Sequence, residues 1–134
     1  MSRITCKFGG SSVASVPQYL KIQKILDQDP RRQIIVVSAP GKRHSKENKL
    51  TDLLYLCHDE AQKHMPLDAP FGLIRERFVE IEKELGLDAG IAVEMEKFRQ
   101  EILDGGERDY IASRGEYFSG KLVAKFLKAT FIDP

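Results

Sequence analysis

The sequence is poor in cysteine, has no long apolar run and carries almost no excess charge, and each absence excludes a kind of protein. Its two cysteines, Cys6 and Cys57, have no metal-ligand spacing, so we expect two buried free thiols in a reducing cytoplasm. Because the N-terminus lacks a long apolar segment, neither a signal peptide nor a membrane span is predicted. A net charge of +1 gives no broad basic surface, so nucleic acid is not expected as a partner.

Two common phosphate-binding motifs are missing as well. The chain contains neither G-x-G-x-x-G nor G-x-x-x-x-G-K-[ST]. Gly41-Lys42 comes nearest to the second motif, but Arg43 follows it and Val36 occupies the position of the first glycine. What remains is an ordinary composition, 42% hydrophobic and 31% charged over 134 residues, which is enough for one domain with a substantial core.

The most informative stretch lies at the start of the chain. Apolar and polar side chains alternate over residues 4–8, which predicts a β-strand, and a helix signal follows at Pro17. Between them, Gly9 and Gly10 can adopt backbone angles closed to other residues and let a ligand come close. Lys7 stands beside this turn, whose successive N–H groups would attract an anion. The pattern indicates a phosphate site; an ordinary tight turn with a surface lysine is the alternative.

A second strand is predicted at residues 33–38. It is β-branched and apolar on both faces, so we expect helices on both of its sides. With a helix over residues 17–27, the segment forms a strand–helix–strand unit with a right-handed crossover. In such sheets ligands bind beyond the carboxyl ends of the strands. We therefore expect Lys7 with its glycines, and Ser38 with residues 39–41, to lie at one rim.

The remainder of the chain is predicted to be mostly helical. Residues 41–49 form a polar, basic and mobile loop, which either helps to hold an anionic substrate or is merely solvated, and Asn48 is a plausible helix cap. Apolar stripes then predict helices, of which the second and third form an antiparallel hairpin inserted between sheet elements. A further strand is predicted to start at residue 129. The helical stripes run over residues 50–61, 71–85 and 91–102, and the last helix runs from about 107 to 128.

The last predicted helix carries the run Ser113-Arg114-Gly115-Glu116. On a helix, the neighbours of Glu116 are the residues three and four positions away, and all of them are small. An uncrowded carboxylate of this kind is open to a ligand. Close helix packing with Glu116 paired to a basic residue is an equally good interpretation. The small neighbours are Ala112, Ser113, Ser119 and Gly120.

Three stretches of the chain resemble motifs of the aspartate kinases, within the amino-acid kinase family. They are Lys7-Phe8-Gly9-Gly10-Ser11-Ser12-Val13, the segment from Ser38-Ala39 through Leu50-Thr51-Asp52-Leu53-Leu54, and Ser113-Arg114-Gly115-Glu116. The resemblance covers nearly the whole chain in the family's order. It implies an α/β fold, a three-layer αβα sandwich of the amino-acid kinase (carbamate-kinase-like) type. Residues 1–134 would be its N-terminal, amino-acid-substrate portion with an inserted helical hairpin, without the nucleotide-binding half and the regulatory domains.

The reaction that the resemblance implies is transfer of a phosphoryl group from ATP to the side-chain carboxylate of L-aspartate. The products are 4-phospho-L-aspartate and ADP, and the step leads towards lysine, threonine and methionine. Mg²⁺ would arrive with the nucleotide, and the full-length enzyme would be a cytoplasmic homo-oligomer. We expect residues 1–134 alone to be inactive. A kinase acting on a different carboxylate or carbamate, and a non-catalytic binding or assembly module, are the alternatives.

The same resemblance assigns a role to individual residues. Lys7 would contact the transferring phosphoryl group as the catalytic residue, and Glu116 would bind the ammonium group of aspartate. No residue is expected to ligate a metal. The length of the basic loop leaves the family equivalent of Thr51 open. The ATP phosphates would be bound by Lys7, Gly9, Gly10 and Ser11, and the aspartate by Ser38, Thr51 and Glu116.

Overall fold

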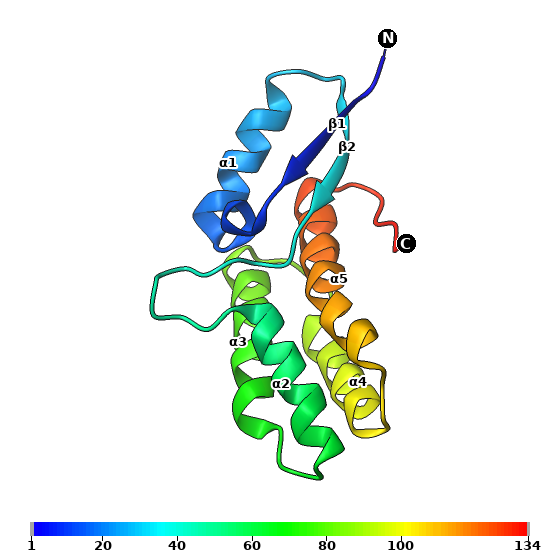
Figure 1. The fold of residues 1–134 in the computed structure, drawn as a ribbon. Helices are drawn as coiled ribbons and strands as arrows, with labels where there is room; N and C mark the ends of the chain where they lie inside the picture. The colour runs from blue at the N-terminus through cyan, green and yellow to red at the C-terminus, as the bar shows by residue number, and fades with distance from the viewer. Residues whose placement is uncertain (1, 134) are drawn as a thin grey trace.

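The structure is a computed structural model that describes residues 2–133, and it combines two strands with five α-helices and one short 3-10 helix (Figure 1). In chain order the elements are β1 (Ile4–Phe8), η1 (Gly10–Val13), α1 (Val16–Asp27), β2 (Arg32–Val37), α2 (Leu50–Gln62), α3 (Asp68–Glu84), α4 (Ile91–Leu103) and α5 (Arg108–Leu127).

The predicted strand–helix–strand unit is confirmed. Strands β1 and β2 pair in parallel, with Lys7 opposite Val36 and Phe8 opposite Val37. Helix α1 carries a proline in its first turn, where the missing N–H group costs nothing, and it buries Tyr19 and Ile22. Both strands therefore end at the same side of the sheet.

Only one face of this small sheet is well covered, so the prediction that β2 is covered on both faces is wrong for the described chain. Ile35 and Val37 pack against the core. Ile34 and Val36, on the opposite face, remain 45% and 46% exposed. The reason is that the later helices pack mainly against one another.

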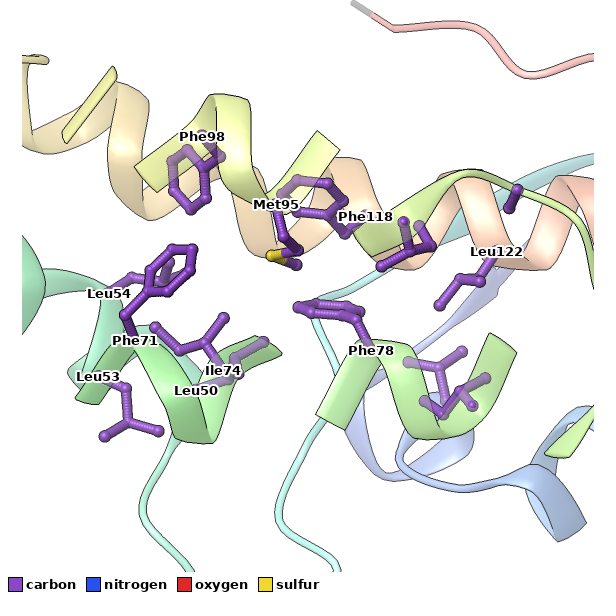
Figure 2. Close-up of a cluster of buried hydrophobic side chains, with 14 of the residues drawn as sticks. Leu50, Leu53, Leu54, Phe71, Ile74, Phe78, Met95, Phe98, Phe118 and Leu122 are labelled. Atoms are coloured by element: carbon purple, nitrogen blue, oxygen red, sulfur yellow. The ribbon is translucent and has the colours of Figure 1, made fainter. Parts of the chain in front are cut away.

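Helices α2, α3, α4 and α5 form an up-and-down bundle beneath the sheet (Figure 1). The predicted α3–α4 hairpin is present, but it is half of this bundle, because α2 and α5 pack against it. Aromatic rings join the helices in the core: the Phe118 centroid lies 5.4 Å from that of Phe78 and 5.7 Å from that of Phe98. Figure 2 shows this core, to which α2 contributes Leu50, Leu53 and Leu54.

The end of the described chain also differs from the prediction. Residues 129–133 form no strand, and Pro134 lies outside the described residues. Phe131 instead packs edge-on against Tyr117 of α5, with the ring centroids 5.4 Å apart. Asp133 pairs with Arg114 at 3.7 Å. These side-chain contacts hold the segment against α5, where it makes no backbone ladder with β2.

The structure also bears on the predicted helix cap, the two cysteines and the layered fold. Lys49, not Asn48, occupies the N-cap position of α2, and it makes no side-chain capping bond. Cys57 is a buried free thiol as expected, whereas Cys6 is only partly buried. Between residues 2 and 133, no helix has the length and apolar character needed to cross a membrane. The three-layer sandwich is not seen, because the described chain supplies only a two-stranded sheet.

Candidate functional site

The first glycine turn leads directly from β1 into η1. Gly9 is extended and Gly10 opens the 3-10 helix. The N–H group of Ser12 donates to the carbonyl oxygen of Gly9 at 3.0 Å, whereas those of Gly10 and Ser11, at the start of the helix, have no acceptor within this turn. A Cβ atom added to Gly9 would have no heavy atom within 4 Å, which shows open space on that side. Lys7 and Ser11 are exposed beside it. The turn thus has free backbone donors and open space beside Gly9, and an exposed lysine lies two residues before it.

The second turn, after β2, is joined to the first by backbone contacts. The N–H group of Gly41 donates to the carbonyl oxygen of Gly10 at 2.8 Å, and that of Ser38 donates to Phe8 at 3.1 Å. A Cβ atom on Gly41 would lie 2.8 Å from the carbonyl carbon of Gly10, so a larger residue would push the turns apart. Lys7, the first turn and Ser38 therefore share one rim, as predicted.

Helix α5 brings Glu116 to the same rim. A Cβ atom on Gly115 would lie 2.9 Å from the Cβ of Ala39, just beyond the end of β2, whereas one on Gly120 would lie 3.8 Å from Val37. Helix α5 therefore runs antiparallel to β2, with its Ser-Arg-Gly-Glu segment beside the carboxyl end of the strand (Figure 1). The missing side chain of Gly115 permits this approach.

Thr51 lies in the first turn of α2 and is partly buried. The preceding residue, Leu50, places its Cδ2 atom 3.6 Å from the Cβ position of Gly115, so Thr51 and Glu116 lie on contacting helices. Within residues 2–133, no hydrogen bond or ion pair joins the side chains of Lys7, Ser38, Thr51 and Glu116. The structure thus brings the supporting elements of the predicted site together, without a direct contact between these side chains.

A groove of about 670 Å³ runs between β2, α5 and residues 129–133. Glu116 is exposed and lines this groove, as do Ser113 and Val36. In the part of the chain that the structure describes, no ion pair involves Glu116, so packing against a basic partner is not what holds it. The other predicted site residues do not line the groove, which is built mainly from the length of β2 and from α5.

Arg77 of α3 was missed by the sequence analysis. It is only 5% exposed, and it donates to the end of η1 at Ala14 and to the second turn at Gly41. The sequence does indicate that Arg77 is buried, because it falls between Ile74 and Ile81 on the apolar stripe of its helix. An arginine on a buried face needs hydrogen-bonding partners, and the stripe alone does not say which.

The basic loop is anchored through Glu47. Its carboxylate accepts hydrogen bonds from the Arg43 N–H group at 2.8 Å and from Arg43 Nε at 2.7 Å, and it pairs with Arg77 at 3.2 Å. Burial would raise the pKa of Glu47, but the hydrogen bonds from Arg43 and the charge of Arg77 outweigh it and hold the pKa at about 2. The described residues contain no group of three or more histidine, cysteine or carboxylate side chains placed to hold a metal ion.

Comparison with known proteins finds similarity to several aspartokinases. No family model matches the chain. It is 34% identical to aspartokinase 3 of Bacillus subtilis, over 96% of this chain and 31% of that protein. The crystal structure of aspartate kinase from Clostridium acetobutylicum superposes with a TM-score of 0.95 at 47% identity, covering 99% of this chain and 31% of that one.

A more distant structure has the same fold. E. coli aspartokinase III, solved with aspartate and ADP, matches 95% of this chain with a TM-score of 0.71 at 21% identity. The chain therefore spans about a third of the length of these three proteins, with coverages of 31%, 31% and 29%. Over almost its whole length, this chain is similar in sequence and structure to a part of the aspartokinases.

Proposed function

We propose that the chain is the amino-acid-substrate portion of an aspartate kinase, which phosphorylates the side-chain carboxylate of L-aspartate with ATP. The observation that carries the proposal is the convergence of three separate motifs at one rim of the sheet. The Gly10–Gly41 hydrogen bond and the close approach of Gly115 to Ala39 produce it. The similarity to aspartokinases supports it, and the remaining two-thirds of those proteins would supply what this portion lacks.

At the phosphate end, the open turn fits an anionic ligand. The N–H groups of Gly9, Gly10 and Ser11 would bind the phosphates of ATP, with Mg²⁺ arriving on the nucleotide. Lys7 would neutralise the charge on the phosphoryl group as it transfers, because such reactions depend mainly on positioning and electrostatic stabilisation. A lysine suits this role as a compact cation on a flexible stem.

At the acceptor end, the exposed carboxylate of Glu116 is a natural partner for the ammonium group of aspartate. The hydroxyl groups of Ser38 and Thr51 would help to orient the substrate. An oxygen of the aspartate side chain then attacks the γ-phosphorus, the bond to the bridging oxygen breaks, and ADP leaves with that electron pair. The product is 4-phospho-L-aspartate, a precursor of lysine, threonine and methionine.

Two other functions make different demands on the site. A kinase whose acceptor carries no amino group would not need a carboxylate at the rim, so Glu116 favours a substrate that carries one. A non-catalytic module with the same fold would need neither Lys7 nor the open space beside Gly9. Lys7 and the open space beside Gly9 therefore favour catalysis over a purely structural role.

The test is ADP release by the complete protein in the presence of Mg-ATP. We expect release to require L-aspartate and to be absent with succinate, which has the same carbon chain without the ammonium group. Residues 1–134 alone should not turn over. A folded, complete protein that releases no ADP with L-aspartate would refute the proposal, and equal release with succinate would refute the role of Glu116.

A further inference from the structure

Arg77 is a buried charge placed between the helical bundle and the two glycine turns. It projects from α3 and is only 5% exposed. A buried guanidinium is costly unless its donors are satisfied, so its partners show what it is there to hold. Arginine presents its donors in a rigid planar fork, which lets one side chain fix several acceptors at once.

The backbone acceptors of Arg77 lie at the end of η1 and in the second turn. Its Nη2 atom donates to the carbonyl oxygen of Ala14 at 3.1 Å and to that of Gly41 at 2.7 Å. Ala14 is the C-cap residue of η1, whose first residue is Gly10. Gly41 is the residue whose N–H group donates to Gly10. One guanidinium thus holds the end of η1 directly, through Ala14, and its start indirectly, through the Gly41–Gly10 hydrogen bond.

The basic loop completes this arrangement. The Nη1 atom of Arg77 pairs with Glu47 at 3.2 Å, and Glu47 is in turn held by Arg43. Arg43 also reaches Glu80, one turn further along α3, at 3.2 Å. The loop after Gly41 is therefore tied to the same helix as Arg77, and moving it away from that helix would break the buried Arg77–Glu47 contact.

We propose that Arg77 is a positioning residue for nucleotide phosphate, which acts by holding the Gly9–Ser11 turn in its binding conformation through Ala14 and Gly41. The inference rests on the proposed function, because it takes the turn as the phosphate site. Arg77 is not itself a ligand, since it is buried and its nitrogens are engaged by protein oxygens. Replacing Arg77 should weaken the binding of ATP strongly and the binding of aspartate little. Glu116, the proposed partner of aspartate, belongs to α5 and not to the turns that Arg77 contacts.

The experiment measures the dissociation constants of Mg-ATP and of L-aspartate by calorimetry on the complete protein. Arg77→Lys keeps the charge but loses the fork, and Arg77→Met removes both. Arg75→Met on the same helix, which takes no part in these contacts, is the control. We expect both Arg77 variants to weaken Mg-ATP binding by at least about tenfold while aspartate binding stays within about threefold of wild type. The Arg75 variant should match wild type for both ligands.

A second variant tests the same linkage if Arg77→Met does not fold. Gly41→Ala would force a Cβ atom to 2.8 Å from Gly10 and should give the same ATP-selective loss. Gly72→Ala, at a helical glycine with open space around it, is its control. Unchanged ATP affinity in Arg77→Lys and Gly41→Ala, or an equal loss for both ligands, would overturn the inference. If wild type binds Mg-ATP but shows no aspartate-dependent ADP release, the proposed function fails while the positioning role is still tested by binding.

Discussion

Gly115 on α5 and Ala39 beyond β2 approach so closely that a Cβ atom on the glycine would lie 2.9 Å from the Cβ of the alanine. This contact sets the position of the Ser-Arg-Gly-Glu segment against the strand end. It also connects the bundle to the rim, because the same Cβ would lie 3.4 Å from Leu54 Cδ1. The position of Glu116 therefore depends on a residue with no side chain.

Replacing Gly115 with alanine should destabilise the protein and weaken aspartate binding. Overpacking costs about 1–3 kcal/mol, which exceeds the gain in helix propensity of about 1 kcal/mol. The displaced helix would carry Glu116 away from the rim, so the KM for aspartate should rise with a smaller change for ATP. Denaturant unfolding and steady-state kinetics measure both effects. Gly72→Ala should be neutral or stabilising, and a Gly115→Ala protein as stable as that control would show that α5 adapts freely.

Replacing Lys7 with alanine should lower kcat much more than it weakens aspartate binding. Loss of a preorganised charge contact to a transition state costs about 3–4 kcal/mol, which corresponds to several hundredfold in rate. Lys7 is exposed at the end of β1, so the fold should survive the change. Steady-state kinetics and a thermal melt on the same sample distinguish a loss of turnover from a loss of folding. Near-normal turnover would remove Lys7 from the reaction.

Replacing Glu116 with glutamine should raise the KM for L-aspartate, with a smaller effect on that for ATP. A hydrogen bond to a charged group contributes about 1.5–3 kcal/mol, so the rise should be at least about tenfold. Glu96→Gln, at an exposed position on α4, is the matched control and should behave as wild type. An unchanged aspartate KM in the Glu116 variant would leave the ammonium group without its proposed partner.

The stability of the protein should depend on the ionisation of Glu47 in acid. Burial opposes its charge, but Arg43 and Arg77 lower its folded-state pKa from 4.5 to about 2. The stabilisation is fully present above pH 4.5 and is lost as the pH falls towards 2. Over that window, one such group changes the free energy of unfolding by up to about 1.4 kcal/mol per pH unit.

The matched comparison is Glu47→Gln, which cannot titrate at this position. Thermal unfolding of both proteins between pH 4.5 and 2 should give a steeper loss for wild type, and the two curves should converge at the acid end. Parallel curves would show that Glu47 does not carry this stabilisation.

Local pattern was enough to predict most elements, because each follows from its own periodicity. The alternation over residues 4–8 and the stripes of α2 to α5 all correspond to observed elements. How the stripes pair could not be predicted, since a stripe specifies an apolar face and not its partner. Residues 129–133 were wrongly predicted as a strand because Phe131 packs on Tyr117 rather than into a ladder.

In the candidate site, too, some residues could be predicted from the sequence and others could not. Lys7, Gly9 and Gly10 are adjacent in sequence, and their relation to Ser38 follows from the geometry of parallel strands. Arg77 could not be predicted as part of the rim, because its contacts with Gly41 and Ala14 depend on how α3 docks beneath both turns. Residues whose role comes from long-range packing are the ones that a single sequence does not reveal.

The most direct test of the account is identification of the phosphorylated product. The complete protein would be incubated with Mg-ATP and L-aspartate, with hydroxylamine present to trap any acyl phosphate as a hydroxamate. The account predicts aspartate β-hydroxamate in an amount equal to the ADP formed, and its loss in the Lys7→Ala variant. ADP formation accompanied only by inorganic phosphate, with no aspartyl hydroxamate, would contradict it.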